Sequence, residues 1–269
     1  MQDLDKFMSK NNYLCENLAS MNAISAVIIT LNEERNIKRC LQSLQNIADE
    51  IVVVDSFSTD ATEQICKSFG VKFIQHAWEG YVKQKQFANS LASNDLIISI
   101  DADEAVSSEL AQSILKIKEL NAEKKVFSMN RLMNYCGKWI RHGGWFPDVK
   151  IRIFDRRFVN WTGGQVHETL DIPSDFATIH LDGDLLHYSF YSEDDFRRQT
   201  EKFARMSADD ALAKGKKSTL FGAYVHCFWR FVRDYIFKAG FLDGKTGLRI
   251  SQINAKSVFL KRKLIAKKS

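Results

Sequence analysis

The stretch ISAVIITLNEERNIKRCLQSL, residues 24–44, decides the fold. Its first seven residues are apolar or small and mostly β-branched, a pattern typical of a strand that is buried on both faces. Apolar side chains at Ile37, Leu41 and Leu44 then recur at helical spacing, and Asn32 stands where a helix cap is expected. The stretch therefore predicts a buried strand followed by a helix that opens at Asn32.

The same succession of strand and helix continues to about residue 120. Further buried strands are predicted at residues 51–54, 71–74 and 96–100, and further helices at 62–69, 81–92 and 108–120. Strands separated by helices indicate an α/β fold, with a doubly wound, mostly parallel sheet covered by helices on both faces. Residues 127–187 lose this alternation and are expected to extend the sheet. Residues from about 193 onward are predicted to be helical.

The formal net charge of +5 conceals an uneven distribution. The chain up to Phe196 has 20 basic and 28 acidic residues, whereas the rest has 18 basic and 5 acidic ones. An acidic body therefore carries a strongly basic C-terminal quarter. The hydrophobic share of 45% is that of an ordinary globular protein and excludes a disordered or fibrous chain.

Polar side chains follow the predicted strands at their carboxyl ends, where doubly wound sheets bind ligands. They are Thr30, Asn32 and Glu33 after the first strand, Asp55, Ser56, Ser58 and Asp60 after the second, and Asp101, Asp103 and Glu104 after the fourth. Asn32 and Asp60 are equally well explained as helix caps. Three acids at one strand end repel one another unless a cation or hydrogen-bond donors compensate. Mg²⁺ and Mn²⁺ bind carboxylates together with substrate phosphates, so we expect a divalent cation and a diphosphate at this edge.

Several other kinds of site are disfavoured by the sequence. The chain has neither a G-x-G-x-x-G motif after its first strand nor a P-loop, which argues against dinucleotide oxidoreductases and P-loop NTPases. The five cysteines are odd in number and lack a C-x-x-C pair, so we expect reduced thiols. No segment has the character of a signal peptide or a membrane span, and a cytoplasmic protein is expected.

Six longer segments occur in order along the chain. They are VIITLNEERNIKRCL, IVVVDSFSTDAT, KQKQFANSLA before ISIDADE, GGWFPDVKIRIF, WTGGQVHE and DYIFKAGFLDGKTG. The first three resemble the nucleotide-sugar-binding half of family 2 glycosyltransferases with a GT-A fold. The last three resemble the bacterial subgroup that includes lipopolysaccharide core β-glucosyltransferases. The resemblance covers about residues 24–250.

The residue pattern and the resemblance together predict an organisation in three parts. A polar leader at 1–22 precedes a catalytic domain at 23–192, and a basic amphipathic helical extension follows at 193–269. Within the catalytic domain, the nucleotide-sugar half covers about 23–122 and the acceptor half about 123–192.

The resemblance also implies roles for matched positions. Nucleotide-sugar binding would fall on Thr30, Asn32, Glu33, Asp55, Lys85, Asp101, Arg152 and His167. Asp55 would bind the base or ribose, and Lys85, in place of the family's usual Arg, would face the diphosphate or base. Asp101 and Asp103 match the D-x-D motif, with Asp103 the more direct metal ligand and Asp101 nearer the ribose. Arg152 would offset the charge of the diphosphate leaving group.

Inverting transfer needs a carboxylate that takes the proton of the acceptor hydroxyl. Glu168 matches the subgroup's V-H-E signature and is the expected general base, while His167 would orient it or help to hold the metal or diphosphate. Asp148 is the reserve base or a partner of a sugar hydroxyl. The alternative is that Glu168 is a surface carboxylate and His167 a structural imidazole.

Residues 221–241, FGAYVHCFWRFVRDYIFKAGF, contain eight aromatic residues and predict an amphipathic helix with a basic border. Such a helix suits the surface of an anionic membrane. The alternative is that its apolar face packs against the rest of the protein. Nucleic acid is not expected as a partner, because the body is acidic and no binding motif accompanies the charge.

These observations predict an inverting, metal-dependent hexosyltransferase. We expect transfer of glucose from UDP-glucose to a cell-envelope glycan or glycolipid, such as lipopolysaccharide core, by a protein peripheral on the cytoplasmic face of the inner membrane. The alternative is a membrane-associated protein that binds a sugar nucleotide without transferring the sugar. Nucleotidyl transfer is disfavoured, because no Gly-rich phosphate loop lies near the first strand.

Overall fold

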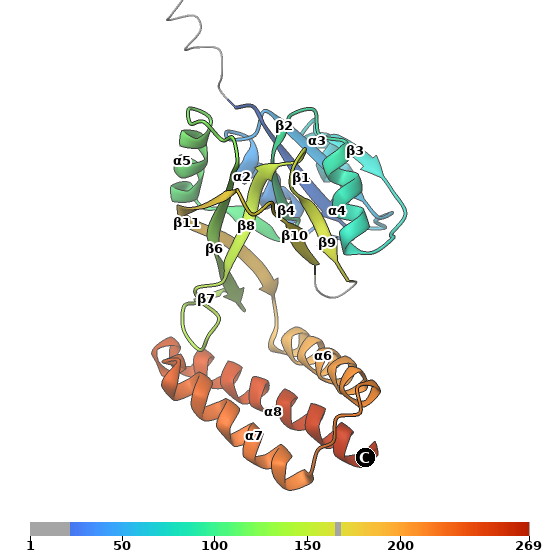
Figure 1. Ribbon diagram of the computed structural model, residues 1–269, viewed down its shortest axis with the longest axis vertical. Coiled ribbons are helices and arrows are strands. Elements are labelled where there is room, and N and C mark those ends of the chain that lie inside the picture. The colour runs from blue at the N-terminus through green and yellow to red at the C-terminus, as the bar shows by residue number, and fades with distance from the viewer. Residues whose placement is uncertain (1–21, 165–167, 269) are drawn as a thin grey trace, which may run out of the picture. The chain divides into compact units, whose positions relative to one another are not determined.

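The computed structural model describes residues 22–164 and 168–268. The described residues form two compact units, one from residues 22–130, 149–164 and 168–185, the other from residues 131–148 and 186–268 (Figure 1). The strands are β1 (Ile24–Thr30), β2 (Glu50–Asp55), β3 (Lys72–Gln75), β4 (Leu96–Asp101), β5 (Glu104–Val106), β6 (Lys125–Tyr135), β7 (Lys138–Ile140), β8 (Val149–Asp155), β9 (Asn160–Gly163), β10 (Glu168–Asp171) and β11 (Ala177–Phe190). The helices are α2 (Ile37–Leu44), α3 (Thr62–Ser68), α4 (Tyr81–Ser90), α5 (Ser108–Ile117), α6 (Glu193–Ala213), α7 (Leu220–Val232), η1 (Arg233–Phe237), η2 (Gly240–Asp243) and α8 (Gly244–Lys268).

The main sheet has the strand order β3-β2-β1-β4-β8-β6-β11-β5, and β7 pairs with β6. The neighbours β3, β2, β1 and β4 run parallel, whereas β8 is antiparallel to both β4 and β6. β9 and β10 form a separate antiparallel pair. The predicted α/β fold with a largely parallel sheet is therefore confirmed, as is its extension by residues after 127.

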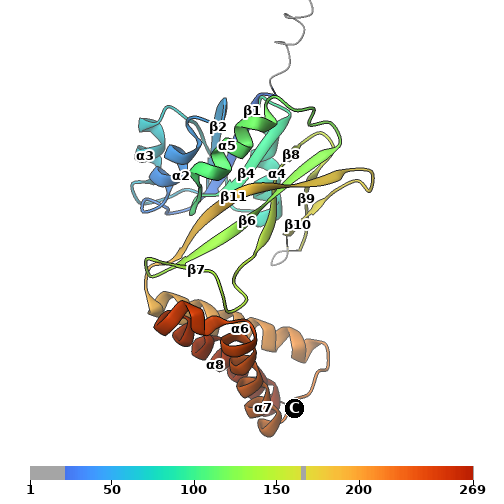
Figure 2. The same ribbon diagram turned by 90° about the vertical axis from the view of Figure 1, so that its left-hand side faces the viewer.

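Alternate side chains of the parallel strands enter two cores, one on each face of the sheet. On one face Ile24, Ala26 and Ile28 of β1 pack with residues of α2 and α5. On the other face Val27 packs with Ala88 of α4. Both faces of the parallel strands are covered, which is why these strands are apolar without regular alternation. Figure 2 shows α2 and α5 over the sheet from the side.

The start of the first helix differs from the prediction. α2 begins at Ile37 with Asn36 as its cap residue, so the prediction that Asn32 caps this helix is wrong. Asn32 instead has a left-handed backbone with φ of 55°, a conformation that asparagine tolerates better than most residues. The segment between β1 and α2 is therefore a loop with its own hydrogen bonds.

The second unit has its own core, built from Tyr135, Ile140, Phe190, Phe196, Ile250 and Ile253. Its long helices α6 and α7 both pack against α8. The α7–α8 connection is tight, because a Cβ atom on Gly247 would lie 1.9 Å from the backbone oxygen of Gly240. Among the described residues, no helix is both long and apolar enough to cross a membrane.

Candidate active site

The loops that follow β1 and β2 are tied to each other by hydrogen bonds. The Asn32 side-chain oxygen accepts the backbone N–H of Thr59 at 2.8 Å, and the Ser58 hydroxyl accepts the backbone N–H of Asn32 at 2.7 Å. The Glu33 N–H donates to the Thr62 hydroxyl at 2.8 Å. These hydrogen bonds hold the two loops together, so that they form one continuous surface at the carboxyl edge of the sheet.

Asp55 is fully buried at the end of β2. Its carboxylate accepts the backbone N–H of Ser58 at 2.8 Å and also the Ser58 hydroxyl. In this structure Asp55 therefore organises the loop that contacts Asn32. The Thr30 hydroxyl, at the end of β1, is buried and has no hydrogen-bond partner among the described residues.

Acidic side chains from three strand ends lie close enough to influence one another. The pKa of Glu33 is raised by burial, and a hydrogen bond from Asn36 opposes this. The charges of Asp103, Asp60 and Asp101 raise the Glu33 pKa further. The predicted convergence of carboxylates from the ends of β1, β2 and β4 is present, and together they make this edge strongly negative.

Arg152 of β8 neutralises part of this negative charge. Its side chain is only 4% exposed, and Nη2 lies 2.9 Å from Asp101 Oδ2 and 2.8 Å from Glu104 Oε1. Burial opposes its charge, but Glu104 and Asp101 outweigh burial and raise the Arg152 pKa above its ordinary value. Glu104 also accepts the Asp101 backbone N–H at 3.0 Å. Arg152 and Glu104 thus hold the first acid of the D-A-D-E segment in place.

Lys85 of α4 joins the strand-end acids to the β9–β10 pair. Its Nζ is 3.1 Å from Asp101 Oδ1 and 2.7 Å from Glu168 Oε1, and the residue is 2% exposed. The ammonium also lies 4.4 Å from the centre of the Trp161 ring, in cation–π contact. The structure therefore brings Glu168 to the edge that Asp101 occupies.

The donor set at this edge suits a hard divalent cation that is shared with a phosphate ligand. Asp101 and Asp103 offer carboxylate oxygens, and their negative charges add to the burial that raises the pKa of Glu33. Within residues 22–164 and 168–268, no three Asp, Glu, His or Cys side chains form a complete cage for an ion. Mg²⁺ usually keeps several waters and takes one or two carboxylates plus substrate phosphates, so no such cage is needed.

Asp148 belongs to the second unit, where its Oδ2 lies 2.8 Å from Nη2 of Arg131. His167 falls outside the residues that the structure describes.

One residue at this edge, Gln84, was not predicted from the sequence. It is fully buried beside Lys85, donates to the Ser56 hydroxyl at 3.1 Å and lies 3.0 Å from the His76 ring. The signal was a run of polar residues on the buried side of α4, where an ordinary amphipathic helix has apolar ones.

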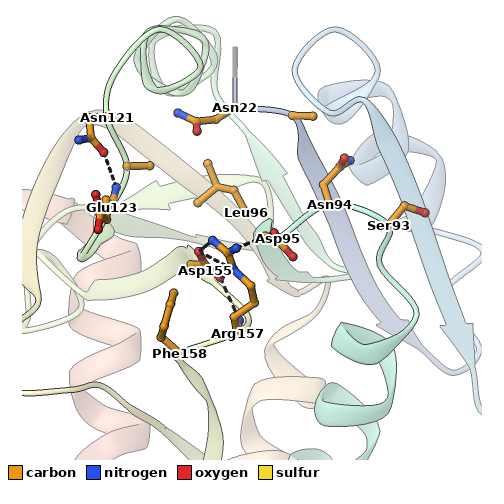
Figure 3. Close-up of a pocket in the computed structure, with 12 residues that line it drawn as sticks. Asn22, Ser93, Asn94, Asp95, Leu96, Asn121, Glu123, Asp155, Arg157 and Phe158 are labelled. Atoms are coloured by element: carbon orange, nitrogen blue, oxygen red, sulfur yellow. Dashed lines mark hydrogen bonds and ion pairs between the residues drawn. The ribbon is translucent and has the colours of Figure 1, made fainter. Parts of the chain in front are cut away.

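A hollow of about 650 Å³ opens at the opposite, amino-terminal edge of the strands (Figure 3). It is lined by the segment before β4 and by Arg157, whose guanidinium pairs with Asp95 at 3.1 Å and Asp155 at 2.6 Å. Arg157 thus engages two of the three carboxylates that line the hollow, and the third is that of Glu123. Since ligands of such sheets bind at the carboxyl ends, the acidic edge is the candidate active site.

Comparison with known proteins adds an independent line of evidence. A family model described as glycosyl transferase family 2 matches residues 25–170. A glycosyltransferase of Rickettsia typhi is 32% identical over 252 residues, which cover 90% of this chain and 86% of the relative. The lipopolysaccharide core biosynthesis glycosyltransferase LpsC of Rhizobium meliloti is 26% identical over 262 residues, 91% of this chain and 94% of the relative.

The solved structures are more distant. Glucosyl-3-phosphoglycerate synthase of Mycobacterium tuberculosis, in complex with Mn²⁺, UDP and glucosyl-3-phosphoglycerate, aligns with 42% of this chain and 44% of its own. The identity is 21% and the TM-score 0.36. A likeness at that level carries no argument about the metal or substrate of this chain. The family model and the Rickettsia relative do establish the family: the chain is a glycosyltransferase and belongs to glycosyl transferase family 2.

Proposed function

We propose that this glycosyltransferase is an inverting, divalent-cation-dependent hexosyltransferase that moves glucose from UDP-glucose to a cell-envelope glycan or glycolipid. The observation that carries the proposal is the Lys85 bridge between Asp101 and Glu168. The bridge supports an assignment in which Glu168, from the proposed acceptor half, works beside Asp101 of the proposed D-x-D motif. A donor held by the strand-end acids would therefore have a base within reach of its sugar.

The proposed reaction is a single displacement. The acceptor oxygen forms a bond to the anomeric carbon while the bond from that carbon to the diphosphate oxygen breaks, and the leaving UDP keeps the electron pair. Glu168 takes the hydroxyl proton of the acceptor. Asp148, paired with Arg131, is the reserve base or binds a sugar hydroxyl of the acceptor.

The diphosphate would be held through a Mg²⁺ or Mn²⁺ ion on Asp103 and Asp101. When bound, the ion would supply positive charge that neutralises the diphosphate in both the donor and the leaving group. Thr30, Asn32, Glu33 and Asp55 would line the nucleoside pocket, with His167 and Arg152 beside the diphosphate. Because acids outnumber the two buried cations here, a diphosphate would be repelled without the metal.

The acceptor class is suggested by the relative named as a lipopolysaccharide core biosynthesis glycosyltransferase. A glycolipid acceptor would place the enzyme at the cytoplasmic face of the inner membrane. The basic C-terminal quarter of the chain supports an anionic surface as a neighbour.

Titration calorimetry with UDP in the presence and absence of Mn²⁺ tests the proposal. We expect binding that needs the metal and is lost in Asp103→Ala, with Asp95→Ala at the opposite edge as the matched control. Metal-independent binding, or unchanged binding by Asp103→Ala, would refute the metal site. A panel of nucleotide sugars with a glycolipid acceptor then separates transfer from the alternative, a protein that binds the donor without turnover.

A further inference from the structure

The outward side of α7 and of the turns after it carries an unusual number of exposed apolar side chains. Phe221 is 80% exposed, and Phe228 and Phe237 are each 70% exposed. The set that we call the aromatic face consists of Phe221, Tyr224, Val225, Phe228, Trp229, Ile236, Phe237, Phe241 and Leu242. Spacings of three and four residues place its α7 members on one side of the helix.

The aromatic face lies on the side of α7 that α8 does not cover. Ala223, between its members, is fully buried, and α7 packs against α8. Tyr224 marks the border, with its ring 4.8 Å from that of Phe259 on α8. Large apolar side chains that are scattered singly need no explanation, but a contiguous stripe of this size marks an interaction surface.

Basic residues predominate in the part of the chain that carries the aromatic face. Residues 214–268 contain fourteen basic and two acidic residues, and the structure describes this range completely. Both acids, Asp234 and Asp243, are buried. Asp234 pairs with Arg230 and Arg233, and Asp243 pairs with His142.

Exposed lysines border the aromatic face at both ends. Lys214, Lys216 and Lys217 precede α7, and Lys238 and Lys245 follow it. With both acids buried, the charge that this part of the second unit presents to solvent is positive. A partner that fits this surface must therefore offer an apolar region to the aromatic face and negative charge to the lysines at its ends.

We infer that the aromatic face is a docking surface for an anionic lipid bilayer, with α7 lying in the plane of the interface. Aromatic and aliphatic side chains would enter the boundary between headgroups and acyl chains, and the lysines at both ends would contact the headgroups. The inference deepens the membrane location in the proposed function and rests on that function only for the acceptor being in the bilayer.

Two other occupants fit less well. A second copy of the chain would bring the same positive border against itself. Single-stranded nucleic acid is bound by a basic groove that tracks its backbone beside stacked bases. Here Val225, Ile236 and Leu242 interrupt the aromatics, on a convex helix with its lysines at the ends. A bilayer satisfies both the apolar stripe and the charge.

Flotation of the full-length protein with lipid vesicles tests the inference. The vesicles contain phosphatidylcholine alone or with phosphatidylglycerol added. We expect the wild type to float with the anionic vesicles and far less with the neutral ones. Phe228→Ser/Phe237→Ser should reduce the bound fraction about tenfold or more, because it removes two large insertion anchors. The matched control is Phe203→Ser/Met206→Ser, which alters exposed apolar residues of α6.

A second measurement does not depend on how well that variant folds. Brominated lipids should quench the tryptophan fluorescence of the wild type, and Trp229→Phe should remove most of the quenching. Wild type that stays unbound to anionic vesicles, or quenching that persists in Trp229→Phe, would overturn the inference. Two other results would also overturn the inference. The wild type could form a dimer, or a complex with single-stranded DNA, that is lost in Phe228→Ser/Phe237→Ser while the vesicle binding of that variant is unchanged. Vesicle binding is measured without nucleotide and UDP binding without lipid, so either proposal can fail alone.

Discussion

Lys85 and Glu168, 83 residues apart in the sequence, meet at 2.7 Å between Nζ and Oε1. The ammonium is buried and also contacts Asp101, so it fixes the position of the proposed base relative to the proposed metal-binding segment. The desolvation of buried charges offsets much of the attraction between them. An ion pair that joins two halves of a site therefore contributes more to positioning the side chains than to stability.

Replacing Glu168 with Gln should abolish proton acceptance while leaving the shape of the site nearly unchanged. We expect transfer to fall by about 10²–10⁴-fold, the usual contribution of a general base. UDP binding, measured by calorimetry, should change little. Asp171→Asn, on the same strand β10, is the control and should transfer normally. Activity retained in Glu168→Gln would remove this residue from the mechanism.

Replacing Lys85 with Met should loosen the site and destabilise the protein. The two carboxylates would lose a buried partner, but both are about 30% exposed and water would partly replace it. We therefore expect a loss of about 1–3 kcal/mol in the free energy of unfolding by urea, together with reduced transfer. Lys85→Arg keeps the charge and should recover part of both. Lys83→Met, whose lysine is 68% exposed in its pair with Glu79, should change stability by less than about 1 kcal/mol.

Arg152→Met should be among the most destabilising substitutions in the first unit. It would leave the Glu104 carboxylate, which is 0% exposed, buried without its cation. Breaking a buried pair in this way costs about 3–5 kcal/mol, measurable as a shift in the urea midpoint. Arg157→Met removes a 57% exposed arginine instead and serves as the control. Equal stability of the two variants would show that Arg152 and Glu104 do not support the site.

Glu33 should make stability depend on pH. Its pKa is raised from the ordinary value of 4.5, by burial first and then by Asp103, Asp60 and Asp101. The folded protein thus binds this proton more tightly than the unfolded chain, and stability falls as pH rises from 4.5 through the raised pKa. Glu33→Gln removes this loss, so its stability relative to wild type should increase over that window.

Thermal unfolding of Glu33→Gln and wild type at a series of pH values checks this expectation, with the exposed Glu79→Gln as control. At pH values above the raised pKa of Glu33, saturating Mg²⁺ should reduce the difference in stability between Glu33→Gln and wild type, because a cation would offset the repulsion among the acids. A difference that is constant across pH would contradict the assignment.

The parallel part of the sheet was predictable because its signal is local. Apolar runs such as Ile24–Thr30 need no information about distant partners to be recognised as buried strands. The start of α2 was misplaced by four residues because Asn32 can serve as a cap or adopt a left-handed loop conformation, and bonds to Ser58 and Thr59 select the loop. The long strand Ala177–Phe190 mixes exposed and buried residues, so only pairing with its neighbours defines it.

The site was predictable to the extent that strand ends determine it. Asp101 and Asp103 follow a strand, and the rule that ligands bind at carboxyl ends was enough to place them. That Lys85 contacts Glu168 depends on where the β9–β10 pair lies against α4, and the local sequence does not encode this. Arg152 was expected near the diphosphate, and the structure adds that Glu104 and Asp101 already engage it.

The close approach of Gly240 and Gly247 has a consequence for how sequence signatures are interpreted. A methyl group at either position would collide with backbone, at Gly240 with the Asp234 oxygen at 2.7 Å. Gly240 and Gly247 of the DYIFKAGFLDGKTG segment are therefore explained by steric exclusion at a helix corner, and Gly244 by its left-handed backbone with φ of 62°. A short motif that helps to identify a family can thus record how two backbones pass each other, and a mutational scan should find Gly240 and Gly247 intolerant of substitution for this steric reason.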